Sequence, residues 1–173
     1  MGLTADQQQA LNTQNNGRKQ KGLSPLQWDA HLASEAQKWA DNLAHKIGHM
    51  QHSTSQERPN QGENLFWGMA SPGPYKDPYA HAAQAWMNEA AKYHGEKIGE
   101  GDFSGYGHYS KFVIATLPCE TGEMEWLTER KTAQCMWKST THVGMAAATD
   151  NKGGVYVVGR YSPPGNWTGQ KPY

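Results

Sequence analysis

The sequence predicts an α+β domain, because helix-type patterns fill its first half and strand-type patterns fill its last third. In the first half, apolar residues recur at helical spacing between turn signals. In the last third, runs rich in β-branched and aromatic residues are separated by a glycine-containing turn. A length of 173 residues suits one domain with a substantial core. Helices covering both sides of a sheet are therefore expected.

Two helices are predicted before residue 48. The first covers about residues 4–21 and is closed by Gly22, a residue favoured after a helix end. Ser24-Pro25 then breaks the chain. The second helix has one apolar face, whose members recur every three or four positions: Trp28, Leu32, Ala36, Trp39, Ala40 and Leu43.

The middle of the chain combines a loop with a third helix. Residues 48–75 are rich in Gly, Pro, Ser and Asn, which predicts mostly loop with a short ordered piece at Asn64–Trp67. Asp77-Pro78 begins a third helix, on which apolar residues and Glu89 fall on adjacent turns. Glu89 is therefore expected to project from a helix near an apolar face.

Three strands are predicted in the C-terminal part, with the sequences CMWKST, HVGMAAAT and GVYVVGRYS. They are rich in β-branched and aromatic residues, which favour a pleated and half-buried surface. The segment DNKGG joins the last two as a hairpin turn.

The charge pattern restricts the possible partners. Sixteen acidic and sixteen basic side chains balance, so no broad field attracts nucleic acid or an anionic membrane. No apolar run approaches the roughly 20 residues that a bilayer span requires, so no transmembrane segment is expected. The N-terminus is polar from Thr4 onward, and no signal peptide is recognised in this sequence. Binding must therefore come from a local site.

Four residues carry the candidate chemistry: His52, Glu63, Glu89 and His108. Two imidazoles and two carboxylates can hold a divalent cation such as Zn²⁺ or Mg²⁺, and they can also perform acid-base chemistry through water. Alternatively, Glu63 only fixes a loop and Glu89 only fastens two elements together. No nucleophile motif accompanies the four residues, and their spacing is not that of HExxH. Binding is therefore favoured over catalysis, and no catalytic residue is assigned.

Five motifs occur in a characteristic order: HSxxxxRxxxGENLFWG, AxAWMNEAAKY, GHY at residues 107–109, QCMWKSTTHVGMA and RYSPPGNW. In these motifs the chain resembles the cysteine-rich secretory, antigen 5 and pathogenesis-related-1 proteins, the CAP family, over nearly its whole length. The resemblance implies a single domain over residues 1–173 with a three-layer α-β-α sandwich around a mostly antiparallel sheet. It also implies a secreted protein in which the four candidate residues share one cleft.

The resemblance implies a lipid-binding site before the third helix. Tyr75 and Tyr79 lie where sterol-binding members carry their lipid-contacting loop, and aromatic faces suit a sterol or a fatty acid. In the alternative interpretation these tyrosines only cap the core. The favoured function is thus a secreted fungal CAP-family protein that binds a small apolar ligand. A metal-dependent hydrolase is the least favoured alternative.

The C-terminal segment PPGNWTGQKPY, residues 163–173, resembles the signalling peptide released from plant members of the family. The resemblance makes Pro163 the first residue of a releasable peptide, and a host protein or receptor its partner. In this alternative function the protein is an effector or a peptide precursor. The rival interpretation is a turn followed by a packed tail. Asn166-Trp167-Thr168 is also an N-glycosylation sequon.

Residues 111–132 interrupt the family pattern, because GHYS is followed by KFVIATLPCETGEMEWLTERKT before QCMW. The segment is interpreted as a tolerated surface insertion, a functional loop or a translated intron. We favour the intron, because the codons allow donor, branch-point and acceptor sequences whose removal restores GHYTQCMW. KFVIATL is strand-like and would compete with the strand expected after His108. The insert also carries Cys119, whose pairing with Cys135 the sequence leaves open.

Overall fold

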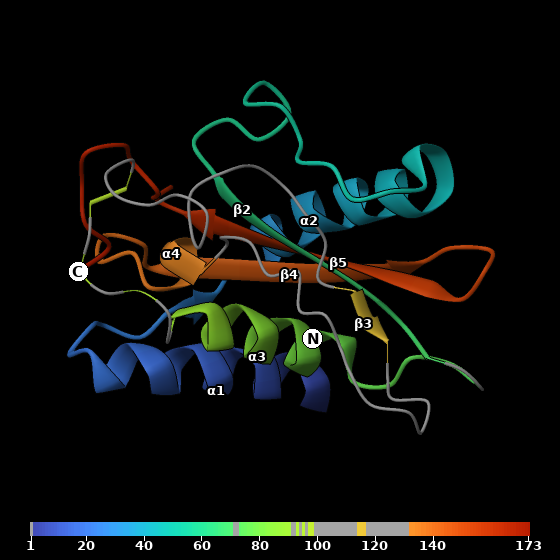
Figure 1. Ribbon diagram of the computed structural model, residues 1–173, viewed down its shortest axis with the longest axis horizontal. Helices are drawn as coiled ribbons and strands as arrows, with labels where there is room; N and C mark the ends of the chain where they lie inside the picture. Colours follow the sequence, from blue (N-terminus) through green and yellow to red (C-terminus); the bar gives the residue numbers. More distant parts are fainter. Residues whose placement is uncertain are drawn as a thin grey trace.

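The computed structural model describes residues 2–70, 73–90, 93, 95, 97–98, 114–116 and 132–173. Three layers are visible in Figure 1, with α2 (Ala30–Asn42) on one face of the sheet and α1 (Ala5–Gln20) and α3 (Pro78–Ala90) on the other. A π-helical turn, η1 (Leu43–Ile47), extends α2. A short helix, α4 (Thr132–Cys135), lies near the C-terminal tail. The expected α+β sandwich is confirmed.

The sheet has five strands in the described part of the chain, in the order β1-β4-β5-β2-β3. Its three long strands are β2 (Gly62–Met69), β4 (His142–Thr149) and β5 (Gly154–Ser162). The central β5 pairs antiparallel with β2 and with β4. The short edge strands β1 (Gln27–Trp28) and β3 (Ile114–Thr116) pair in parallel with β4 and β2. The sheet is therefore mostly antiparallel, as expected.

Local sequence signals explain where the two N-terminal helices begin and end. Thr4 and Gln7 form a capping box at the start of α1, and each side chain satisfies a backbone amide of the other residue. Gly22 follows this helix at a positive φ of 67°. Asp29 caps α2 by accepting a hydrogen bond from the Leu32 amide at 2.9 Å.

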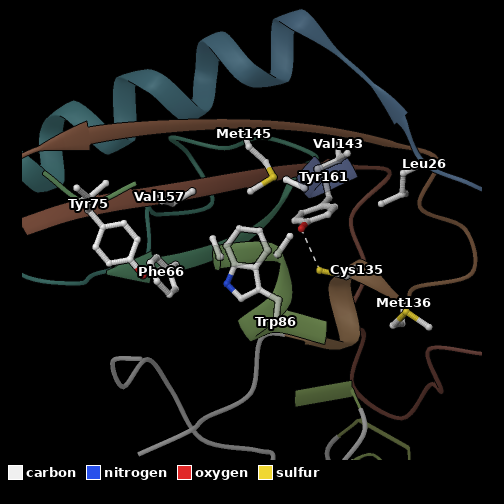
Figure 2. Close-up of a cluster of buried hydrophobic side chains, with 14 residues drawn as sticks. Leu26, Phe66, Tyr75, Trp86, Cys135, Met136, Val143, Met145, Val157 and Tyr161 are labelled. Carbon is white, nitrogen blue, oxygen red and sulfur yellow. Dashed lines mark hydrogen bonds between the residues drawn. The ribbon is translucent and has the colours of Figure 1, made fainter. Parts of the chain in front are cut away.

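The core consists of two clusters, one on each face of the sheet. Val157 and Tyr161 of β5 face α1 and α3, and between them Val158 faces α2, as the two-residue period of a strand requires. Figure 2 shows Trp86 of α3 inserted among Phe66, Val157 and Tyr161. Because β5 is buried on both faces, its sequence is a nearly continuous apolar run.

Two strand predictions were wrong, and tertiary contacts explain both. CMWKST was expected to be a strand, but α4 and a turn occupy this region. The buried guanidinium of Arg18 donates hydrogen bonds to the carbonyl oxygens of Cys135, Trp137 and Thr140, which therefore need no sheet partner. The expected loop at 48–75 contains the eight-residue strand β2 rather than a short piece.

The inserted segment is described only in part. Ile114–Thr116 pairs in parallel with Trp67–Met69 at the sheet edge, so the strand-like character of KFVIATL is confirmed for these three residues. His108 and Cys119 lie outside the described residues. None of the described helices is long and apolar enough to cross a bilayer.

Candidate functional site

The candidate site is organised around the carboxylate of Glu63, which lies at the start of β2 and is buried. One oxygen, Oε1, is 2.5 Å from His52 Nδ1 and accepts the Ser53 amide at 3.0 Å. The other, Oε2, accepts the Ser53 hydroxyl at 2.8 Å and lies 3.2 Å from Arg160 Nη2. Four donors therefore occupy the carboxylate, which leaves it little capacity to coordinate a cation.

The charge of Glu63 is retained despite its burial. Burial favours the neutral acid, but hydrogen bonds from His52 and Ser53 and the charge of Arg160 outweigh it, and the net effect lowers the pKa of Glu63. Burial also lowers the pKa of Arg160, and the Glu63 carboxylate partly opposes that shift. Glu63 and Arg160 are direct cross-strand partners on β2 and β5, so the sheet register builds this ion pair.

The His52 ring is oriented by its contact with Glu63. Because the carboxylate is ionised and can only accept, Nδ1 carries the hydrogen in this contact. A histidine whose second nitrogen is held by a carboxylate is a common arrangement around zinc in proteins.

Arg58 fixes the loop that connects His52 to β2. Its Nε donates to the Ser53 carbonyl at 3.1 Å, and its Nη1 donates to the Gln61 carbonyl at 3.0 Å. Arg58 Nε is also 4.0 Å from Glu63 Oε1, so a second positive charge lies close to the carboxylate. The loop is thus anchored to the same ion-pair cluster that orients His52.

A cavity of about 650 Å³ lies beside this cluster. Its walls come from the loop before β2, from α4 and from the C-terminal tail. The lining residues are His52, Ser55, Arg58, Pro59, Asn60, Gln61, Gly62, Glu63, Gln134, Pro164, Gly165, Asn166 and Trp167. Most are polar, and Trp167 is 53% exposed. The volume is within the range of small-molecule sites, roughly 300 to 1,000 Å³.

Only two of the four predicted cleft residues are brought together by the contacts described above, namely His52 and Glu63. Glu89 lies in the last turn of α3, half-buried, and its charge helps raise the pKa of the Cys135 thiol. His108 is outside the described residues. Among the residues that are described, no group of three His, Cys, Asp or Glu side chains could hold a metal ion. The shared four-residue cleft stays a prediction.

The two tyrosines predicted to contact lipid differ in exposure. Tyr75 is buried in the core cluster, with its ring centroid 6.1 Å from that of Phe66 and 5.3 Å from that of His81. Tyr79 is half-buried at the start of α3 and packs against the same cluster. Burial raises the pKa of both phenols. Tyr75 thus belongs to the protein interior, and Tyr79 borders it.

The predicted peptide tail is held along its length. The Pro163 carbonyl accepts the Thr140 hydroxyl at 2.8 Å, and the Gly165 amide donates to Gln134 Oε1 at 2.7 Å. Farther on, the Pro172 carbonyl accepts an amide from the turn after α4 at 2.7 Å. Pro163 itself is exposed at the end of β5.

Sequence reasoning missed Arg160, whose buried guanidinium lies 3.2 Å from Glu63 and helps lower the pKa of that carboxyl. A signal was available, because Arg160 is the charged residue in the otherwise apolar run GVYVVGRYS. A charge inside a buried strand requires a partner of opposite sign. Ser53 and Arg58 were present in the quoted motif without a role, and Trp167 was noted only as part of the sequon.

The three-layer arrangement of helices and sheet defines a class of small α-β-α sandwich domains. Two solved structures share this arrangement. The structure of NaASP2 with Zn²⁺ has a TM-score of 0.69 and 20% sequence identity, and the match covers 99% of this chain and 87% of that one. The structure of Na-ASP-1 has a TM-score of 0.70 and 18% identity, and the match covers 100% of this chain and 42% of that one. At these identities they establish the fold.

The chain belongs to the CAP family, described as the cysteine-rich secretory protein family, whose model matches residues 11–161. It is 35% identical to pathogenesis-related protein PR-1 of Medicago truncatula, over 95% of this chain and 78% of that protein. It is 31% identical to pathogenesis-related protein 1C of Nicotiana tabacum, over 96% and 80%. It is also 34% identical to secreted protein RBT4 of Candida albicans, over 95% of this chain but 37% of that protein.

Proposed function

We propose that this chain is a secreted CAP-family binding protein with a divalent-cation site at His52 and an apolar-ligand site near Tyr79. Family membership and the likeness to a secreted protein of Candida albicans support the extracellular location. The observation that supports the cation site is the contact of 2.5 Å between Glu63 and His52 Nδ1, because a carboxylate on one ring nitrogen is common among zinc-binding histidines. His108 is the second proposed ligand, with Glu89 holding a bound water.

Zn²⁺ and Mg²⁺ differ in how well this donor set suits them. Imidazole nitrogen is a good ligand for zinc, whereas magnesium prefers oxygen. A solved structure of the same fold, NaASP2, was crystallised with Zn²⁺. We therefore favour Zn²⁺. Bound zinc would polarise a water molecule, while the protein residues orient the ring and fix its hydrogen.

Zinc titration by calorimetry tests this site. His52→Ala is expected to lower the affinity for Zn²⁺ by at least about tenfold, because one of two imidazole ligands is lost. His49→Ala is the matched control, since His49 is an exposed histidine in the same segment. Equal zinc affinity in the parent and in His52→Ala would rule out the site.

Binding rather than catalysis is supported by the nearby candidate nucleophiles. The Ser53 hydroxyl is buried and donates to Glu63, so it is directed toward the carboxylate instead of a substrate. Burial raises the pKa of the Cys135 thiol to about 12, which keeps it protonated and unreactive at neutral pH.

The apolar-ligand site is proposed at Tyr79. Its half-buried ring packs against the core cluster, so an apolar molecule placed beside it would extend the core. Cholesterol and palmitate are suitable probes for the sterol and fatty-acid classes. Tyr79→Ala is expected to weaken binding of one of them by about tenfold. Tyr75→Phe tests whether the Tyr75 hydroxyl contributes to ligand binding, because it removes that group and keeps the core packing. Gln84→Ala is the control, since Gln84 is exposed on α3. Unchanged affinity in Tyr79→Ala would contradict the proposal.

Release of the C-terminal peptide is a second candidate function, favoured by the exposure of Pro163 directly after β5. Incubation of the full chain with host extracellular fluid is expected to yield a fragment beginning at Pro163, detected by mass spectrometry. Heat-treated fluid serves as control. An intact tail after prolonged incubation would argue against a precursor role.

A further inference from the structure

The exposed ring of Trp167 is unusual for this molecule. Among the described residues it is the large hydrophobic side chain classed as exposed, at 53%, whereas Trp39, Trp86 and Trp137 are buried. It also borders the 650 Å³ cavity. An exposed tryptophan at a cavity mouth offers a flat apolar face and an indole N–H donor to a ligand.

Two asparagines at the same cavity have an uncommon backbone conformation. Asn60 has a φ of 58° and Asn166 a φ of 61°, and they come from the loop before β2 and from the tail. Of the three non-glycine residues with positive φ in the described chain, these two line the cavity, and the third is Asp77. Conformations of this kind concentrate at binding sites. Both residues lie in the wall of this cavity.

The polar groups at this wall have spare hydrogen-bonding capacity. Neither the Asn60 nor the Asn166 side-chain amide is engaged by a described residue. Each amide offers two donors and an acceptor, a set that matches a hydroxyl group, which both donates and accepts.

We propose that this cavity is a saccharide-binding site, in which a sugar ring stacks on Trp167 and its hydroxyl groups bind Asn60 and Asn166. A pyranose has one face of C–H groups and a rim of hydroxyl groups, which matches an indole face beside free amides. The cavity volume suits a short oligosaccharide. The site requires neither the proposed cation nor the apolar ligand.

Calorimetric titration of the full chain, produced without glycosylation in bacteria, tests the proposal. The probes are chitotriose, laminaritriose and mannotriose, which distinguish chitin, β-1,3-glucan and mannan as the source of the sugar. At least one is expected to bind. Trp167→Ala should weaken binding by at least about tenfold, and Trp167→Tyr, which restores an aromatic face, should recover most of the affinity.

Glycine variants test the two amides without disturbing the backbone, because glycine adopts a positive φ readily. Asn60→Gly and Asn166→Gly should each weaken sugar binding. Asp77→Gly is the matched control, because Asp77 also has a positive φ but does not line the cavity, so this variant should bind sugar as the parent does. Lys171→Ala is a further control on the exposed tail. Absence of binding to all three sugars, or equal binding by Trp167→Ala and the parent, would overturn the proposal.

Discussion

At Glu63 a single buried carboxylate connects a histidine, a loop and a central strand. Its partners are His52, Ser53 and Arg160, and the guanidinium of Arg160 is itself buried. A buried ion pair of this type contributes little relative to apolar residues, but removal of one partner leaves the other charge uncompensated. The stability of the folded protein is therefore expected to depend strongly on the charge of Glu63.

Glu63→Gln is expected to lower the free energy of unfolding by about 3 kcal/mol, because Arg160 would lose its buried counter-charge. Urea unfolding measures the effect. Glu57→Gln is the matched control, since Glu57 is exposed in the same loop and its carboxylate accepts hydrogen bonds from Thr54 alone among the described residues. Similar destabilisation by both variants would show that the ion pair is unimportant.

The buried thiol of Cys135 gives a prediction at alkaline pH. Its pKa is raised from an ordinary value of 9.0 to about 12, so its contribution to stability is complete below pH 9 and is lost as the pH rises toward 12. The pKa of Tyr161, which bonds to this thiol at 3.1 Å, is raised in the same direction. The free energy of unfolding should fall across this window, and less steeply in Cys135→Ala.

Thiol labelling provides an independent measurement of the same environment. In a Cys119→Ser background at pH 8, Cys135 should react with a disulfide reagent only after unfolding. Rapid labelling of the native protein would contradict both the burial and the raised pKa of Cys135.

Among the secondary structure elements, the contact between α2 and β4 depends on Gly144. A Cβ atom there would lie 2.1 Å from the Ala33 backbone nitrogen and 2.6 Å from the Asp29 carbonyl oxygen. Gly144→Ala must therefore move the helix, and we expect a loss of about 2 to 3 kcal/mol of stability, measured by thermal unfolding. Gly2→Ala, with no atom within 4 Å, is the control and should be neutral.

The elements also show why some predictions from sequence failed. Helical periodicity placed most of α2, which buries Leu32, Ala36, Trp39 and Ala40 on one face. It was wrong for Trp28, which was expected on this face but lies in β1 and pairs with Val143. The start of β2, before the ordered piece expected at Asn64–Trp67, was missed because Gly62 and Glu63 have low strand propensity, and pairing with β5 makes them part of the strand. The α4 region was misassigned because Arg18, more than 100 residues earlier in the chain, binds its carbonyl groups.

For the candidate site, sequence was sufficient for the pair of His52 and Glu63 but not for its surroundings. The motif placed both residues eleven positions apart, and the hydrogen bond between them follows from the turn that returns the chain to β2. Arg160 and the tail residues Asn166 and Trp167 could not be foreseen, because their proximity depends on sheet register and on how the tail packs. The shared cleft with Glu89 and His108 stays a prediction.

At the scale of the whole molecule, the insert at 111–132 is the principal departure from the family pattern. The translated-intron interpretation predicts that deletion of Lys111–Thr132 gives a protein with a higher melting temperature, although the short β2–β3 pairing is lost. Thermal unfolding of both forms measures this. Sequencing of the transcript across Tyr109–Gln134 is the direct test, and a spliced message that retains the segment would defeat the interpretation.

The tail that contributes Pro164 through Trp167 to the cavity is the same segment that would leave as a peptide beginning at Pro163. Cleavage before Pro163 would therefore remove part of the cavity wall in the same step that releases the peptide. A single molecule could therefore bind a sugar or release the peptide, but not both at the same time. A sugar bound to Trp167 would therefore slow cleavage before Pro163. The concentration of carbohydrate around the protein would then affect the lifetime of the uncleaved chain.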